Sequence, residues 1–224
     1  MLKAAVFDMD GVIVDSHPAH KRAWREFLLS IGRCVSDEEL NFVLDGRRRD
    51  EILRFFLGEL SNTQICKYSD RKNELFYAAC GDLKLTDGLL DFMYALEQAG
   101  VRMAVASSAA CSRVDYILER FGIRKRFCTV VSANDVKRGK PDPEIYSRAC
   151  EKLDALPSAT LAIEDAVSGI KAARAAGMKC LGVADSSRAP LLYEAGAEHV
   201  IPDFTKIQIS DLNEFFGSTN ATLR

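Results

Sequence analysis

The second half of the chain repeats one local pattern, in which an amphipathic stretch ends at or near a glycine and a short apolar run follows. It occurs four times, over 89–100 and 101–106, 113–122 and 128–132, 166–177 and 178–183, and 191–196 and 199–201. Glycine is common just after the last turn of a helix, and a short apolar run indicates a buried strand. Alternating helices and strands of this kind predict an α/β fold with a parallel sheet covered by helices on both faces.

The first strand of this sheet is expected at 4–7, where an apolar run is followed by Asp8, Asp10 and Gly11. Ligands of open α/β sheets bind at the carboxyl ends of the strands, so two acids there indicate a site. Two unit charges about 4 Å apart repel by ~4 kcal/mol at an effective dielectric near 20. A cation between them, most simply Mg²⁺, accounts for the pair. The alternative is a solvated turn, in which Asp and Gly are also common.

Between about residues 15 and 84 the sequence carries helix signals only. Pro18 suits the first turn of a helix that stops at Gly32, and capping boxes at 36–39 and 61–64 begin two more helices, the first of which ends near Gly46. We therefore predict a doubly wound, Rossmann-like parallel-sheet core with an inserted all-helical cap. The core is expected to comprise residues 1–14 and 85–224, and the cap residues 15–84.

A basic stretch, 46–49, precedes a short helix that is expected to run through about Leu57. Cations at a helix N-terminus face the positive end of the helix dipole, and helix N-termini bind phosphate. The three arginines of this stretch could therefore form an anion clamp. The alternative is a solvated loop, partly neutralised by Asp50 and Glu51.

Composition narrows the classes of partner and compartment. A net charge of -2 gives no reason to expect nucleic acid or a membrane surface as a partner, and no apolar run is long enough for a membrane span. The seven cysteines include no Cys-x-x-Cys pair and the three histidines lack zinc-ligand spacing, which favours a reducing compartment with cysteines as small core residues. We expect a monomer in the cytoplasm.

Several motifs together resemble the haloacid dehalogenase superfamily of phosphotransferases, and the wider match resembles its β-phosphoglucomutase-like branch. The first is Asp-Met-Asp-Gly-Val from Asp8, followed by Asp-Ser at 15–16. Gly-Lys-Pro-x-Pro around Lys140 and Glu-Asp-x-x-x-Gly-Ile from Glu164 resemble later motifs of the family. In that family the first Asp is the nucleophile and the second the general acid and base. The resemblance implies a Mg²⁺ site formed by Asp8, the backbone carbonyl of Asp10, Glu164 and Asp165.

Ser107 and Ser108 follow the expected strand at 101–106. Ser107 matches the family's phosphate-binding position, although a serine after a strand is also a common helix cap. The resemblance implies that Ser107 and Lys140 bind oxygens of the transferred phosphate. Lys137 and Arg138 are expected to be solvated. The acids at 164–165 could alternatively cap the helix that follows them.

The expected cap also carries family-like positions. His20 and Trp24 form a His-x-x-Ala-Trp arrangement like that of the family cap, although His20 could also be a structural histidine beside an apolar helix face. Arg49 and Lys72 resemble the family's cap arginine and lysine, although a lysine on a long helix is usually solvated. The residues assigned to substrate binding are His20, Trp24, Gly46, Arg49, Lys72 and Ser108.

The resemblance implies Mg²⁺-dependent phosphoryl transfer through an aspartyl phosphate on Asp8. Water as the acceptor gives a phosphatase, and a substrate hydroxyl gives a mutase. Family mutases carry a Lys-Asn pair where this chain has Ala110 and Cys111. We therefore expect hydrolysis of a small phosphorylated sugar or related metabolite, with β-phosphoglucomutase, which interconverts β-glucose 1-phosphate and glucose 6-phosphate, as the alternative. A dehalogenase would leave Asp10 without a purpose, and a catalytically silent binding protein would not need every catalytic position filled.

Overall fold

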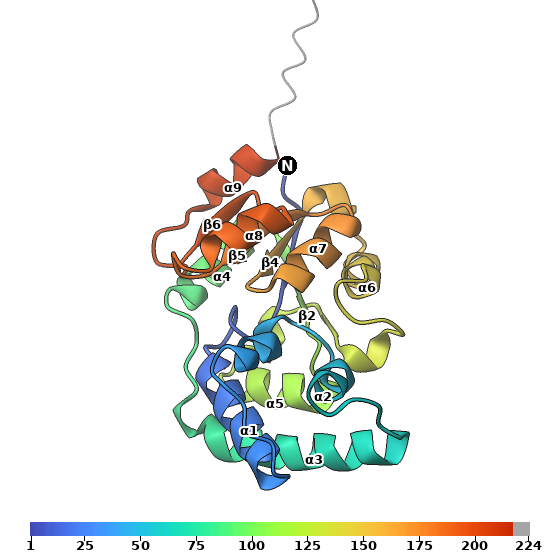
Figure 1. Ribbon diagram of the computed structural model, residues 1–224. Coiled ribbons are helices and arrows are strands. Elements are labelled where there is room, and N and C mark those ends of the chain that lie inside the picture. The colour runs from blue at the N-terminus through green and yellow to red at the C-terminus, as the bar shows by residue number, and fades with distance from the viewer. Residues whose placement is uncertain (217–224) are drawn as a thin grey trace, which may run out of the picture.

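The computed structural model describes residues 1–216, except for the side chain of Asn213, and its centre is a six-stranded parallel sheet (Figure 1). The strands are β1 Ala4–Phe7, β2 Arg102–Ala106, β3 Thr129–Val131, β4 Thr160–Glu164, β5 Lys179–Val183 and β6 His199–Ile201. Their order is β3-β2-β1-β4-β5-β6, with every neighbouring pair parallel. The predicted doubly wound α/β fold is confirmed.

Helices cover both faces of the sheet, and this explains why the inner strands read as continuous apolar runs. All four residues of β1 are buried: Ala5 and Phe7 pack into one apolar cluster, while Ala4 and Val6 pack into the other. The helices packed into the first cluster are α4 Leu89–Gln98, α5 Cys111–Arg120 and α9 Ile209–Phe215. Those packed into the second are α6 Glu144–Leu153, α7 Val167–Ala175 and α8 Ala189–Ala195. The sequence patterns did not predict α6 and α9.

The segment between β1 and α4 contains no strand and lies below the sheet in Figure 1. Its helices are α1 His17–Ser30, α2 Arg49–Leu57 and α3 Asn62–Ala79, with 3-10 turns at Glu39–Leu44 and Cys80–Asp82. The first capping box forms as predicted, but the element that follows it is a 3-10 helix. This segment has an apolar cluster separate from the two clusters at the sheet, and the cluster includes Trp24, Phe27, Leu53 and Phe56. Val14 pairs with Leu85, which brings the two connections side by side, and we propose this bridge as the boundary between cap and core.

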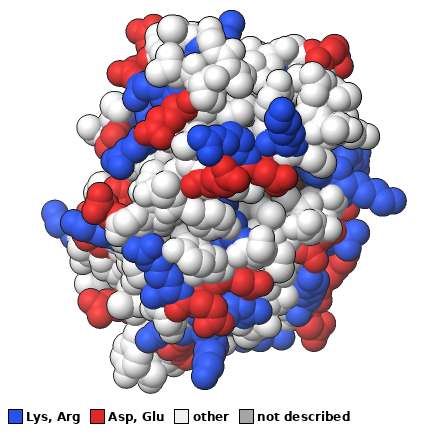
Figure 2. All heavy atoms as spheres, turned by 90° about the horizontal axis from the view of Figure 1, so that it is seen from below, with Lys and Arg blue, Asp and Glu red and all other residues white. Residues whose placement is uncertain are grey.

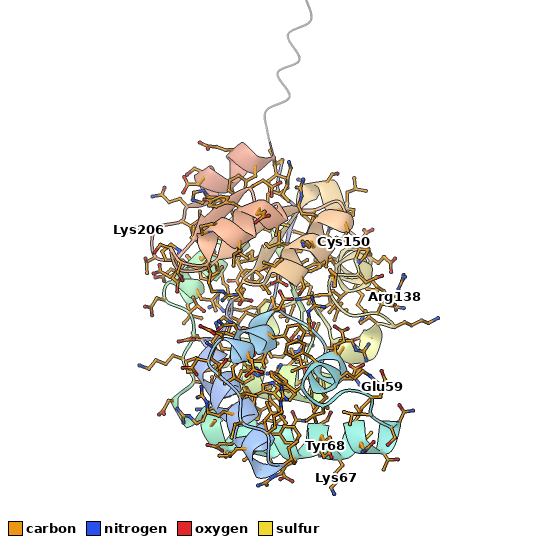
Figure 3. The ribbon with its side chains drawn as sticks, in the orientation of Figure 1. Glu59, Lys67, Tyr68, Arg138, Cys150 and Lys206 are labelled. Carbon is orange, nitrogen blue, oxygen red and sulfur yellow. The ribbon has the colours of Figure 1, made fainter. Side chains whose placement is uncertain are left out.

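The surface agrees with the charge balance of the sequence. Lysines and arginines are interspersed with acids over the face seen in Figure 2, and Arg138 extends outward from the molecule in Figure 3. Among the described residues, no helix combines the length and apolar character that crossing a bilayer requires. Cys80, Cys150 and Cys180 are buried but the other four cysteines are exposed, so the expectation of core cysteines holds for three of the seven.

Candidate active site

Three neighbouring strands deliver the predicted catalytic residues to one edge of the sheet. Phe7 pairs with Val105 of β2 and Ile163 of β4, so the residues that follow these strands meet. They border a pocket between the sheet edge and the helical segment. The predicted site residues that line it are Asp8, Asp10, His20, Trp24, Gly46, Arg49, Lys72, Ser107, Ser108 and Asp165. Lys140 and Glu164 are fully buried and reach the site through contacts with its acids.

Lys140 is held between two carboxylates. Its Nζ lies 2.5 Å from Asp8 Oδ1, 2.5 Å from Glu164 Oε1 and 3.2 Å from the carbonyl oxygen of Ala106. Burial disfavours the ammonium, but Asp8 and Glu164 outweigh this and raise the pKa of Lys140. Tyr146 donates its hydroxyl to the same Glu164 oxygen at 2.7 Å. Lys140 therefore remains charged beside Asp8.

The acidic cluster fits a divalent cation. Asp8, Glu164 and Asp165 each place an oxygen within 4.8 Å of the others, and all three are buried. Burial raises the pKa of Asp8, and the charges of Glu164 and Asp165 raise it further against the effect of Lys140. Asp165 Oδ2 is a buried oxygen without a hydrogen-bond partner among the described residues, although His17 Nε2 lies 2.8 Å from it. Lys140 pairs with Asp8 and Glu164, and Arg188 Nη1 lies 3.6 Å from Asp165 Oδ2, so three carboxylates face two cationic side chains and leave a negative charge for a further cation.

Glu164 is already occupied by protein donors. Its Oε2 accepts hydrogen bonds from the backbone N–H groups of Asp165 and Ala166 at 3.0 and 3.1 Å. Its Oε1 accepts hydrogen bonds from Lys140 Nζ and from the Tyr146 hydroxyl. Asp8 and Asp165 are consequently better placed than Glu164 to bind an ion. The metal role of Glu164 stays a prediction.

The turn after Asp10 depends on Gly11. Its φ is +79°, and a Cβ atom there would lie 2.6 Å from Asp165 Oδ2 and 2.5 Å from His17 Nε2. No L side chain fits this conformation and this space together. The glycine thus lets the loop after β1 pass close to Asp165.

Asp10 is tightly hydrogen-bonded from its own loop, from α1 and from α5. Its carboxylate accepts a hydrogen bond from Ser16 Oγ at 2.6 Å and lies 3.2 Å from His20 Nε2. Arg113 donates to the same carboxylate from Nη1 at 3.2 Å and from Nη2 at 2.7 Å. Burial opposes ionisation, but Arg113, His20 and Ser16 prevail and hold the pKa of Asp10 well below its usual value. In this arrangement Asp10 is ionised and has no proton to donate.

Arg113 was not among the predicted site residues. It lies on α5 and is buried with Val114, Ile117 and Leu118, so it occupies the inward face of that helix. An arginine in register with an apolar stripe was the signal available in the sequence. Ala110 and Cys111 carry no charge themselves, but Arg113, two positions after Cys111, supplies a cation to the pocket from the core.

The helical segment contributes His20 and Lys72 to the same cluster. Lys72 Nζ lies 2.9 Å from His20 Nδ1, and Arg113 Nη1 lies 2.7 Å from His20 Nε2. Burial and then Lys72 lower the pKa of His20 to about 3, so its ring is neutral. Lys72 is only 3% exposed and lies over the rings of Trp24 and Phe76. The alternative of a solvated lysine is wrong.

The loop before α2 is attached to the sheet edge by hydrogen bonds. Ser108 Oγ donates to the carbonyl oxygen of Gly46 at 2.6 Å, and Ser168 Oγ donates to that of Asp45. Arg48 Nη1 donates to the carbonyl oxygen of Lys137 at 3.3 Å. The N-cap residue of α5 is Ala110, so neither Ser107 nor Ser108 caps that helix. These hydrogen bonds hold the helical segment over the pocket.

Comparison with known proteins agrees with this geometry. The haloacid dehalogenase-like hydrolase family matches residues 2–177. Over 211 residues the chain is 30% identical to validoxylamine A 7'-phosphate phosphatase of Streptomyces hygroscopicus subsp. limoneus, covering 93% of this chain and 97% of that protein. β-Phosphoglucomutase of Bacillus subtilis (strain 168) is 31% identical over 222 residues, covering 95% of each protein.

A solved structure extends the likeness to three dimensions. CbbY from Rhodobacter sphaeroides in complex with phosphate matches with a TM-score of 0.82 at 27% identity, covering 95% of this chain and 100% of that chain. The family match spans most of the sequence, and these relatives align over nearly their whole length. The chain is therefore an enzyme of the haloacid dehalogenase-like hydrolase family.

Proposed function

We propose that the protein is a Mg²⁺-dependent phosphatase that hydrolyses a small phosphorylated sugar or related metabolite through an aspartyl phosphate on Asp8. The observation that carries the proposal is the position of Asp8, at the end of the central strand, 2.5 Å from Lys140 and within the buried acidic cluster. The names of the relatives, which include a phosphatase and a mutase of phosphorylated substrates, support the substrate class. We further propose that it works in the cytoplasm as a monomer.

The proposed chemistry has two steps. A carboxylate oxygen of Asp8 bonds to phosphorus as the ester oxygen leaves, and Asp10 gives that oxygen a proton. Asp10 then takes a proton from water, whose oxygen attacks phosphorus and restores the Asp8 carboxylate. In this proposal Lys140 and Ser107 bind the phosphoryl oxygens, which is supported by Ser107 Oγ accepting a hydrogen bond from the Ala109 N–H at 3.2 Å and so keeping its own proton available.

Asp8, Asp165 and the backbone carbonyl of Asp10, with Glu164 beside them, would hold the Mg²⁺ ion. When bound, the ion supplies charge neutralisation for the transferred group. Because the pKa of Asp10 is held low, its acid role requires that the approach of substrate changes its contacts with Arg113 and His20. Closure of the helical segment excludes bulk water from this step.

Metal binding should depend on Asp165. Replacing Asp165 with Asn removes one charge and keeps the shape, so we expect Mg²⁺ affinity measured by calorimetry to fall at least ~10-fold, a size typical of losing one charged contact. Asp185→Asn is the matched control, since Asp185 lies just after β5 and outside the acidic cluster. Unchanged affinity in Asp165→Asn would place the metal elsewhere.

The acceptor is tested by the ratio of products. With β-glucose 1-phosphate as substrate and β-glucose 1,6-bisphosphate present, we expect inorganic phosphate to appear faster than glucose 6-phosphate in phosphorus NMR spectra. The reason is that Ala110 and Cys111 provide no second pair of polar groups where mutases of the family carry Lys and Asn. Glucose 6-phosphate accumulating ahead of phosphate would make the protein a mutase, with Arg113 as the cation that the core supplies.

A further inference from the structure

Two consecutive residues at the start of α1 contact acids that follow two different strands. Ser16, the N-cap residue, makes no side-chain hydrogen bond to the helix backbone, and its Oγ donates to Asp10 Oδ1 at 2.6 Å instead. His17, the next residue, places its ring nitrogen Nε2 2.8 Å from Asp165 Oδ2. Because Asp10 follows β1 and Asp165 follows β4, the beginning of this helix touches both loops that carry acids of the site.

The contact between His17 and Asp165 has a defined direction. An ionised carboxylate has no hydrogen to offer, so the short distance requires that His17 Nε2 carries the hydrogen between the two atoms. Space at this point is fully used, because a Cβ atom on Gly11 would lie 2.5 Å from His17 Nε2 and 2.6 Å from Asp165 Oδ2. The side chain of Asp165 is only 4% exposed, and exclusion of water strengthens the contact.

Arg188, in the loop after β5, holds the backbone of the same aspartate. Its Nη2 donates to the carbonyl oxygen of Asp165 at 2.8 Å, whereas its Nη1 lies 3.6 Å from Asp165 Oδ2. Among the described residues, His17 and Arg188 are the only basic side chains within 4 Å of that carboxylate, and His17 is the nearer. The core thus fixes the main chain of Asp165, and the helical segment fixes its carboxylate.

His17 also stands between two hollows of the molecule. It lines the pocket that contains Asp8, and it lines a groove on the other side, bordered by the loops after β5 and β6. Asp165 lines the pocket but not the groove. The side chain of His17 is 23% exposed, so the imidazole covers Asp165 on the side that faces the groove.

We propose that His17 is a positioning residue of the metal site, which orients the carboxylate of Asp165 for Mg²⁺ and shields it from the solvent of the groove. His17 is not itself a ligand in this proposal, because the acids whose oxygens lie within 4.8 Å of one another are Asp8, Glu164 and Asp165. Loss of a partner that orients a metal-ligating side chain typically costs about 10–100-fold in metal affinity. The inference rests on the Mg²⁺ site of the proposed function.

The test compares two substitutions of similar size, His17→Gln and His17→Leu. Glutamine keeps a donor at about the reach of Nε2, whereas leucine keeps the bulk and loses the donor. By calorimetry with Mg²⁺, we expect affinity to fall at least ~10-fold in His17→Leu and to stay within ~3-fold of wild type in His17→Gln. The Mg²⁺ concentration that half-saturates phosphate release should rise by the same factor in His17→Leu, and by more than kcat falls. His199→Leu is the control, because His199 is exposed on β6 and lines neither hollow.

Equal Mg²⁺ affinities in His17→Leu and His17→Gln would overturn the inference, even if both variants unfold at a lower temperature than wild type in EDTA. Tighter binding in His17→Leu would also overturn it, because His17 would then compete with the metal. If no phosphate ester is hydrolysed but the two variants differ as expected, the proposed function fails and the role of His17 stands. Hydrolysis by variants of equal affinity would reject the role of His17 alone, and a wild type that binds no Mg²⁺ would reject both.

Discussion

Replacing Asp8 with Asn is expected to lower kcat on a phosphate ester by at least ~10⁴-fold, the size seen when a nucleophile is removed from an enzyme of covalent mechanism. The amide has nearly the same shape, and its oxygen can still accept a hydrogen bond from Lys140, but it cannot bond to phosphorus as a carboxylate does. The measurement is phosphate release under saturating substrate and Mg²⁺. Asp15→Asn is the control, because Asp15 is exposed and lies in the same loop.

The same variant should not unfold more easily than the wild type when Mg²⁺ is absent. The pKa of Asp8 is raised in the folded protein by burial and by Glu164 and Asp165. A raised pKa means that the ionised form weakens folding, and this cost is present at neutral pH and disappears as the pH falls below the usual range of a carboxyl. Asparagine carries no such charge. Wild-type turnover in Asp8→Asn would refute the covalent mechanism, and a lower unfolding temperature in EDTA would refute the charge argument.

Replacing Lys140 with Met is expected to lower the free energy of unfolding by ~3–5 kcal/mol, the usual loss when one partner of a buried ion pair is removed. The ammonium is fully buried, and its removal leaves Asp8 and Glu164 to repel each other away from water. Urea unfolding at pH 7 measures the loss. The loss should shrink at acidic pH, because a protonated carboxyl no longer needs the ammonium.

Lys137→Met provides the matched control, since Lys137 is exposed on the same loop. Its effect should stay within ~0.5 kcal/mol, as is usual for surface substitutions. A loss below ~1 kcal/mol in Lys140→Met would mean that the pair of acids is stabilised by something other than this lysine. Activity should fall as well, by about 10²–10³-fold, because a donor to the phosphoryl oxygens is lost.

The sequence alone predicted the α/β class and the edge of the sheet at which the acids meet. Local patterns carry this information, because an apolar run such as 4–7 has to be buried and acids that follow buried strands have to emerge at the carboxyl edge. The family-like motifs added Ser107, Lys140 and the cap residues, and the structure brings them to one pocket or directly behind it. Their catalytic roles remain predictions.

Only the tertiary structure decided how these residues are paired. Arg113 stands 103 positions from Asp10 and contacts it because the fold brings α5 to the loop after β1, a relation that no local pattern contains. The burial of Lys72, which its place on a long polar helix argued against, follows from contact with His20 and Trp24 across the pocket. Charge balance in a buried site depends on distances between segments far apart in the chain, and Coulomb energies change with those distances and with exclusion of water. For that reason the sequence indicated the catalytic residues around Asp8. The contacts of Arg113 with Asp10 and of Lys72 with His20 emerged only from the folded chain.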